Sequence, residues 1–104
     1  MFSMSKRQET LEGTLYIVNT PPNTPNRLQA CLDLLQADDH LLLIENGVYW
    51  ASEGLSKSLK DLPCPVNVLE GDCLTRGVIS TLPICGDDKF VDFTAEYPRS
   101  VSWF

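Results

Sequence analysis

The hydrophobic pattern of the chain centres on four consecutive aliphatic residues at positions 41–44. A strand with one wet face alternates apolar and polar side chains, so this run predicts a strand covered on both faces, as in the middle of a parallel sheet. Glu45, Asn46 and Gly47 interrupt the run where the strand would end. Sites in open α/β sheets are built at that end. A buried strand followed by a turn without chemistry is the alternative that this pattern leaves open.

Short runs of β-branched and aliphatic residues predict the other strands. The first run ends at Asn19, and three prolines in the next residues exclude a continued strand or an early helix. A later run begins with Pro65, which is tolerated at the first position of a strand. The predicted strands are residues 15–18, 41–45, 65–69, 83–85 and, as an edge strand, 101–104.

Helical periodicity is clearest between residues 25 and 36. Thr24 is the expected N-cap, and Pro25 occupies the first helical position, where a missing N–H costs nothing. One apolar stripe follows at helical spacing, formed by Leu28, Cys31, Leu32 and Leu35.

Three further helices are predicted. Residues 55–62 place leucines on one face, and residues 70–76 form a short helix closed by Gly77. A third helix runs from Asp87 to about Tyr97. We expect this last helix to turn Phe90, Val91 and Thr94 inward, while the pattern of residues 48–53 fits a short helix or a loop equally well.

Strands and helices thus alternate along the chain. This order predicts the α/β class, with a single domain at residues 14–104 built on a mainly parallel sheet with helices on both faces. Residues 1–13 are polar and charged, and we interpret them as a flexible lead-in.

Composition and charge exclude several functions. At 104 residues, 43% hydrophobic and 21% charged, the chain fits one soluble domain with a modest core, which makes a partner plausible. Its net charge of -6 argues against binding nucleic acid by itself, because that binding depends on clustered Lys and Arg. No apolar run approaches the roughly 20 residues of a membrane helix, and no secretory signal is recognisable at the start. A cytoplasmic protein is expected.

The four cysteines show no C-x-x-C spacing, and the single histidine, His40, has no cysteine near it in sequence. A zinc site is therefore not expected, and in a reducing compartment the cysteines should be free thiols. His40 has no evident partner and is expected to be exposed. Without a G-x-G-x-x-G motif or a P-loop, no cofactor is predicted.

Four blocks of sequence now stand in a distinctive order. They are the L-L-L-I-E-N-G-V-Y block at 41–49, V-L-E-G-D with R-G at 68–77, F-V-D-F-T at 90–94, and Trp103. In order and spacing they resemble the TusB/DsrH family of small sulfur-relay subunits, over about residues 14–104. Members often have Asp-Gly where this chain has Glu45-Asn46-Gly47, and Cys31 falls where DsrH chains carry a first-helix cysteine.

The resemblance implies a DsrE-like α/β fold and a heterohexamer with TusC/DsrF-like and TusD/DsrE-like subunits, two copies of each. It also implies persulfide relay among sulfur-carrier proteins. Tus complexes deliver sulfur to the 2-thio group of the transfer RNA wobble uridine, whereas Dsr complexes serve sulfur oxidation. The main sulfur-carrying cysteine of these complexes lies on the TusD or DsrE subunit.

Cys31 is the leading candidate for a sulfur-relay thiol, since a persulfide carrier needs a thiolate that attacks sulfur. Its place on the apolar stripe fits core packing as well, because free cysteine packs as a small hydrophobe. Cys73, at the start of a short helix, is a weaker candidate, and Cys64 and Cys85 are expected to be structural.

The remaining candidates concern contacts. Asp72 and Arg76 are four residues apart and should form a local ion pair, with a subunit contact as the alternative. The aromatic residues Tyr49, Trp50, Trp103 and Phe104 are candidates for an interface, because aromatics are enriched there.

Three functions stay open at this point. They are an accessory, non-catalytic subunit of a sulfurtransferase complex, a standalone sulfurtransferase using Cys31, and a ligand-binding module. The absence of a nucleotide-binding motif disfavours the third reading.

Overall fold

The computed structural model describes residues 13–103. Phe104 and almost all of the predicted lead-in, residues 1–13, lie outside this range. The elements follow in the order β1 (Thr14–Val18), α2 (Pro25–Leu32), β2 (His40–Leu43), η1 (Glu45–Ala51), η2 (Lys57–Leu59), β3 (Val66–Leu69), α3 (Glu70–Arg76), β4 (Ile84–Cys85), α4 (Asp87–Glu96) and β5 (Arg99–Trp103).

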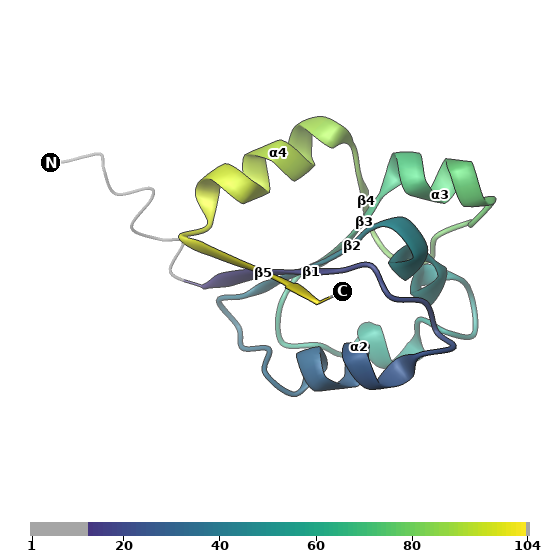
Figure 1. Ribbon diagram of the computed structural model, residues 1–104, viewed down its shortest axis with the longest axis horizontal. Coiled ribbons are helices and arrows are strands. Elements are labelled where there is room, and N and C mark those ends of the chain that lie inside the picture. Colours follow the sequence, from purple (N-terminus) through teal and green to yellow (C-terminus); the bar gives the residue numbers. More distant parts are fainter. Residues whose placement is uncertain (1–12, 104) are drawn as a thin grey trace, which may run out of the picture.

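The strands form one sheet in the order β4-β3-β2-β1-β5, and every neighbouring pair is parallel. Helix α4 lies over one face of this sheet and α2 over the other (Figure 1). Strand β2 is in the middle, and all four of its residues are buried. The predicted α/β class is confirmed, as is the expectation of a central strand covered on both faces. That strand spans residues 40–43 and leaves out Ile44, which is half-buried.

Successive side chains of β2 point to opposite faces of the sheet, so the hydrophobic core has two parts. Leu41 and Leu43 belong to a large cluster shared with α2 and η1, which we call the α2-side core. Leu42 points the other way, into a smaller cluster with Leu15 and Ile17 of β1, the α4-side core. Phe90, Phe93 and Tyr97 cover the α4-side core as half-buried side chains.

Two predicted helices are shorter than expected. Helix α2 ends at Leu32 instead of residue 36, and the chain then turns so that the Asp39 carboxylate accepts a hydrogen bond from the Gln36 amide at 2.9 Å. The helix predicted for residues 55–62 is only the turn of 3-10 helix at η2. There the buried Ser56 hydroxyl lies 2.6 Å from the Thr81 hydroxyl, a tertiary contact that local periodicity does not reveal.

Two predicted orientations are wrong. Val91 is 62% exposed and Thr94 is exposed, because α4 meets the sheet through Phe90, Phe93 and the following Tyr97 instead. His40 was expected at the surface, yet it is only 5% exposed. It begins β2, where strands on both sides and α4 cover it.

Candidate functional site

The carboxyl ends of β1, β2 and β3 meet at one edge of the sheet, because all three strands are parallel. Polar side chains follow each strand there and join in what we call the carboxyl-edge network: Asn19, Glu45, Asn46, Asp72 and Arg76. This is the position where open α/β sheets carry their sites.

Hydrogen bonds connect the three strand ends directly. The Asn19 amide donates to Glu45 Oε1 at 2.9 Å, which links the end of β1 to the end of β2. The backbone amide of Glu45 donates to Asp72 Oδ2 at 2.6 Å, which links β2 to α3. Asp72 therefore holds the start of η1 against α3.

Arg76 completes the network from the last turn of α3. Its Nε donates to Asn46 Oδ1 at 2.9 Å, and its Nη1 lies 3.7 Å from Asp72 Oδ1. The predicted pairing of Asp72 with Arg76 is thus present, with side chains 23% and 24% exposed for Arg76 and Asp72. A pair this accessible contributes only about 0–1 kcal/mol, so its main effect is to orient Arg76 toward Asn46.

The backbone at the start of η1 is constrained. Glu45 has φ of 51°, in the left-handed region that non-glycine residues enter at a cost. At Gly47, an added Cβ would lie 2.4 Å from the Val18 carbonyl oxygen, so only glycine lets η1 approach β1 this closely. Strained backbone of this kind concentrates at functional sites, so we interpret this turn as part of a candidate functional site.

A groove of about 410 Å³ lies beside the network. Its lining includes Tyr49, Arg76, Val78 and Ile79, and Ile79 is 86% exposed. Helix α3 also exposes Leu74. Apolar side chains so open to solvent, beside an organised polar network, are typical of a surface that contacts another protein.

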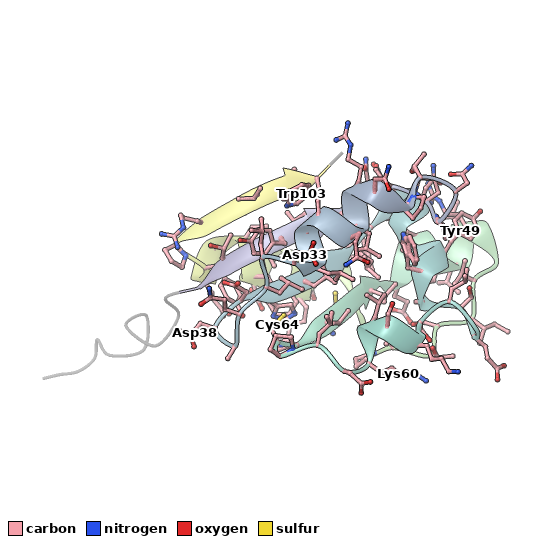
Figure 2. The ribbon with its side chains drawn as sticks, turned by 90° about the horizontal axis from the view of Figure 1, so that it is seen from below. Asp33, Asp38, Tyr49, Lys60, Cys64 and Trp103 are labelled. Carbon is pink, nitrogen blue, oxygen red and sulfur yellow. The ribbon has the colours of Figure 1, made fainter. Side chains whose placement is uncertain are left out.

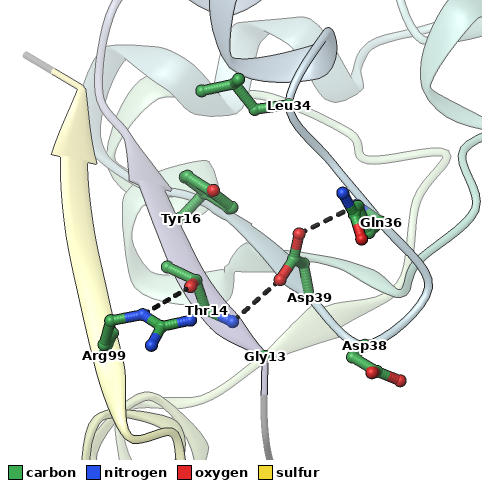
Figure 3. A pocket seen from close by; sticks show the side chains of 8 residues that line it. All are labelled: Gly13, Thr14, Tyr16, Leu34, Gln36, Asp38, Asp39 and Arg99. Atoms are coloured by element: carbon green, nitrogen blue, oxygen red, sulfur yellow. Dashed lines mark hydrogen bonds between the residues drawn. The ribbon is translucent and has the colours of Figure 1, made fainter.

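A second cavity, of about 240 Å³, lies near the opposite ends of the strands (Figure 3). The Asp39 carboxylate there accepts hydrogen bonds from the backbone amides of Thr14 and Gln36, both at 2.9 Å. Arg99 Nε donates to the Thr14 hydroxyl at 3.3 Å. The polar groups along this cavity join β1, β2 and β5, so they stabilise the fold at this edge.

Cys31, the leading relay candidate, is fully buried in the α2-side core. Burial, together with the nearby Cys64 and Asp39, raises the pKa of its thiol to about 12. A thiol with this pKa is almost entirely protonated at neutral pH, and the thiolate is the nucleophile. The relay role of Cys31 stays a prediction, and its environment favours the packing alternative.

The other three cysteines are also buried free thiols. Burial raises the pKa of Cys64 to about 11, and it raises the pKa values of Cys73 and Cys85. The acidic neighbours Asp72 and Glu70 add to the upward shift of the pKa at Cys73. Since the chain has four cysteines, none of its thiols is exposed and activated.

The aromatic candidates lie in different places. Tyr49 is 37% exposed in the groove, while Trp50 is half-buried and its indole N–H donates to the Thr20 carbonyl at 3.1 Å. Trp103 packs on the α2-side core, with a buried Nε1 that has no hydrogen-bond partner among the described residues. Figure 2 shows Trp103 beside the end of β5 and Tyr49 on the opposite side of the molecule. Phe104 lies outside the described residues.

Sequence reasoning placed Glu45 and Asn46 at a strand end where sites are built, but it missed Asn19 and one buried polar residue. Asn19 was treated only as the end of a strand, although residues directly after parallel strands share one edge and so were a usable signal. His40 carried no signal, because its partners Asn67 and Tyr97 lie far along the chain.

Within residues 13–103, no group of three or more potential ligands is arranged to hold a metal ion. None of the helices in that range combines the length and the apolar character that a bilayer crossing requires.

Comparison with known proteins identifies relatives over most of the chain. The family described as DsrH like protein matches residues 20–100. Protein TusB of Salmonella arizonae is 38% identical over 80 residues, 71% of this chain and 84% of the relative. Protein TusB of Erwinia tasmaniensis is 30% identical over 82 residues, 73% of this chain and 86% of the relative.

A similar fold has also been solved. The solution NMR structure of protein Tm0979 from Thermotoga maritima superposes with a TM-score of 0.62 and 29% sequence identity. The match covers 79% of this chain and 91% of that one. These similarities confirm the resemblance that the order of the sequence blocks indicated.

Proposed function

The chain belongs to the DsrH-like protein family, and we propose that it is a TusB-like subunit of a persulfide-relay complex that serves 2-thiolation of the transfer RNA wobble uridine. The family and the TusB relatives indicate a sulfur-relay subunit. The complex and its acceptor are our proposal.

The proposed partners are a TusC/DsrF-like and a TusD/DsrE-like subunit, two copies of each chain in a heterohexamer. In this arrangement the sulfur-carrying cysteine belongs to the TusD/DsrE-like subunit. The burial of every cysteine in this chain is the observation that supports assigning the sulfur-carrying cysteine to the partner subunit. With pKa values raised from the ordinary range, these thiols are poorly suited to attack a persulfide in solution.

The carboxyl-edge network and its groove are the proposed contact with a homologous subunit. The network holds η1 and α3 in one arrangement, so Tyr49 and Ile79 are presented on a preorganised surface. Preorganisation lowers the entropic cost of association. Trp103 is a second proposed contact point, because its ring is half-buried at the end of β5, which is an edge strand of the sheet.

A DsrEFH-like role in sulfur oxidation is the second candidate. It is favoured by the DsrH family match and by the presence of Cys31 in α2. A standalone sulfurtransferase based on Cys31 is disfavoured by the burial of that thiol.

The decisive experiment is co-expression of this chain with two homologous subunits from its own genome. We expect a stable complex of dimer-of-trimers mass in light scattering, and persulfide transfer that depends on the partner's cysteine. Transfer RNA thiolation in a strain lacking this chain should fall and recover on complementation, whereas a sulfur-oxidation role would leave it unchanged.

The isolated chain supplies the contrasting measurement. It should show little or no persulfide turnover, and with a net charge of -6 it should not bind transfer RNA at physiological salt. We also propose a cytoplasmic location, where transfer RNA is modified. Robust turnover by the chain alone, without a partner, would contradict the accessory role and favour the standalone enzyme.

A further inference from the structure

His40 occupies a position that the proposed function does not use. It begins β2, at the edge of the sheet opposite the carboxyl-edge network, and is 5% exposed. Its Nε2 lies 2.8 Å from Asn67 Oδ1 on β3, and its Nδ1 lies 3.1 Å from the hydroxyl of Tyr97, which follows α4. One imidazole therefore connects β2, β3 and the end of α4.

The two hydrogen bonds assign the protons. Asn67 Oδ1 can only accept, so His40 Nε2 carries the hydrogen, and the Asn67 amide nitrogen faces the Pro83 carbonyl at 3.4 Å, consistent with that orientation. In the neutral ring, Nδ1 is then the acceptor for the Tyr97 hydroxyl. A second proton on the ring would sit on Nδ1 and remove that acceptor.

Helix α4 depends on few contacts besides these. No residue of α4 is fully buried. Phe93 packs on the His40 ring with centroids 4.4 Å apart, and the Tyr97 ring meets it edge-on at 5.7 Å. The imidazole is thus both a hydrogen-bond acceptor and a packing surface for the last turn of α4.

We propose that His40 is a proton-operated latch, which holds the end of α4 on the sheet while the ring is neutral and releases it when the ring is protonated. The release would uncover the α4-side core around Leu15 and Leu42, without disturbing the α2-side core. This inference does not depend on the sulfur-relay role.

Among the described residues, no carboxylate accepts a hydrogen bond from the His40 ring, whose two nitrogens meet Asn67 and Tyr97. The β1 residue paired with His40 is the apolar Leu15. The Asp39 carboxylate accepts its hydrogen bonds from the backbone amides of Thr14 and Gln36 instead of from the ring. The titratable groups around the ring and Tyr97 are Asp39 before β2, Cys64 before β3, and Glu96 with Tyr97 at the end of α4. Burial raises the pKa of Tyr97, so its hydroxyl keeps its proton throughout the range in which His40 titrates.

The sign of the pH dependence follows from burial. Burial lowers the pKa of His40 below its ordinary value of 6.5, although the Asn67 hydrogen bond raises it in part. The released form binds the proton more readily, so α4 attachment is complete at neutral pH and weakens as pH falls below about 6.5. Because His40 is the only histidine of the chain, it is the only side chain with an ordinary pKa in that range.

The test is amide hydrogen exchange of the full chain, followed residue by residue between about pH 5 and pH 7.5 and corrected for the intrinsic rate of exchange. We expect protection of the α4 amides to fall on acidification by up to about tenfold per pH unit, while β2 and α2 amides keep theirs. Uniform loss across both cores, or no loss in α4, would overturn the proposal.

Variants separate the latch from general destabilisation. His40→Gln, which cannot titrate, should abolish the pH dependence of α4 protection, and Tyr97→Phe should lower that protection already at neutral pH. Tyr49→Phe makes the same change on η1, away from α4. It should alter neither the α4 protection at neutral pH nor its pH dependence. A pH dependence that survives in His40→Gln would contradict the latch.

A second measurement covers the case in which His40→Gln fails to fold. The single imidazole of the unmodified chain can be titrated by its ring proton resonance. A midpoint that lies below that of a histidine in an unfolded peptide of the same sequence, and that coincides with the loss of α4 protection in the unmodified chain, supports the latch. An equal or higher midpoint, or a loss of protection at a different pH, overturns it.

Discussion

The two faces of the sheet are built differently. The α2-side core is closed by α2, η1 and η2 and includes fully buried side chains such as Leu41, Leu43 and Val48. The α4-side core is smaller and is covered by half-buried aromatic rings and by the hydrogen bonds of His40. One face is thus held mainly by apolar packing, and the other partly by polar contacts that respond to solution conditions.

Leu42 and Leu43 offer a matched pair, since both are fully buried neighbours on β2 that point to opposite faces. Leu43→Ala should lower the free energy of unfolding by about 2–5 kcal/mol, because the α2-side core cannot close the cavity. The loss of unfolding free energy in Leu42→Ala should lie at the low end of that range, since α4 can move toward the sheet and partly fill the cavity. Chemical denaturation measures both, and Leu74→Ala on the exposed face of α3 is the control. Equal losses for Leu42→Ala and Leu43→Ala would remove the contrast between the faces.

Cys31→Ser tests the thiol buried in the α2-side core. If Cys31 only packs, the hydroxyl should lower the free energy of unfolding by about 1–3 kcal/mol while leaving sulfur transfer by the assembled complex intact. Mass spectrometry after exposure to a persulfide donor should find no added sulfur on Cys31 while the partner's cysteine is loaded. An adduct on Cys31, together with lost transfer in Cys31→Ser, would instead support the relay role.

Asp72→Ala tests the carboxyl-edge network. It leaves the Glu45 amide without its acceptor and Arg76 without its ion pair, so the free energy of unfolding should fall by about 1–2 kcal/mol. Assembly with the homologous subunits should weaken further, because η1 loses its fixed position. Glu70→Ala removes a carboxylate from the same helix turn and should change neither quantity appreciably. Similar effects in both variants would indicate a general charge effect.

Trp103→Phe should have the smallest effect on the isolated chain, within about 1 kcal/mol, since the lost indole N–H has no partner among the described residues. If the half-buried ring packs against another subunit, the same change should weaken the complex measurably in analytical ultracentrifugation. Trp50→Phe is the informative comparison, because its N–H is already bonded to Thr20 within the chain. An unaffected complex would exclude the Trp103 indole from the interface.

Much of the fold could be predicted because its signals are local. The aliphatic run at 41–44, the start of α2 at Pro25 and the closure of α3 by Gly77 all follow from side chains adjacent in sequence. The ion pair of Asp72 with Arg76 was predictable for the same reason, since four residues span one helical turn. The prediction of a helix at 55–62 was wrong, because the Ser56 hydroxyl is hydrogen-bonded to that of Thr81. Thr81 lies outside the segment, so the periodicity of residues 55–62 could not reveal this contact.

By itself, the sequence determined the fold class, the family, the central strand and the place along the chain where a site should lie. Only the tertiary structure decided how the pieces are used. It brought Asn19, Glu45 and Asp72 together at one edge, buried all four thiols, and enclosed His40 between Asn67 and Tyr97. Periodicity and capping act over a few residues, whereas burial and the pKa values that follow from it depend on segments that meet only when the chain is folded.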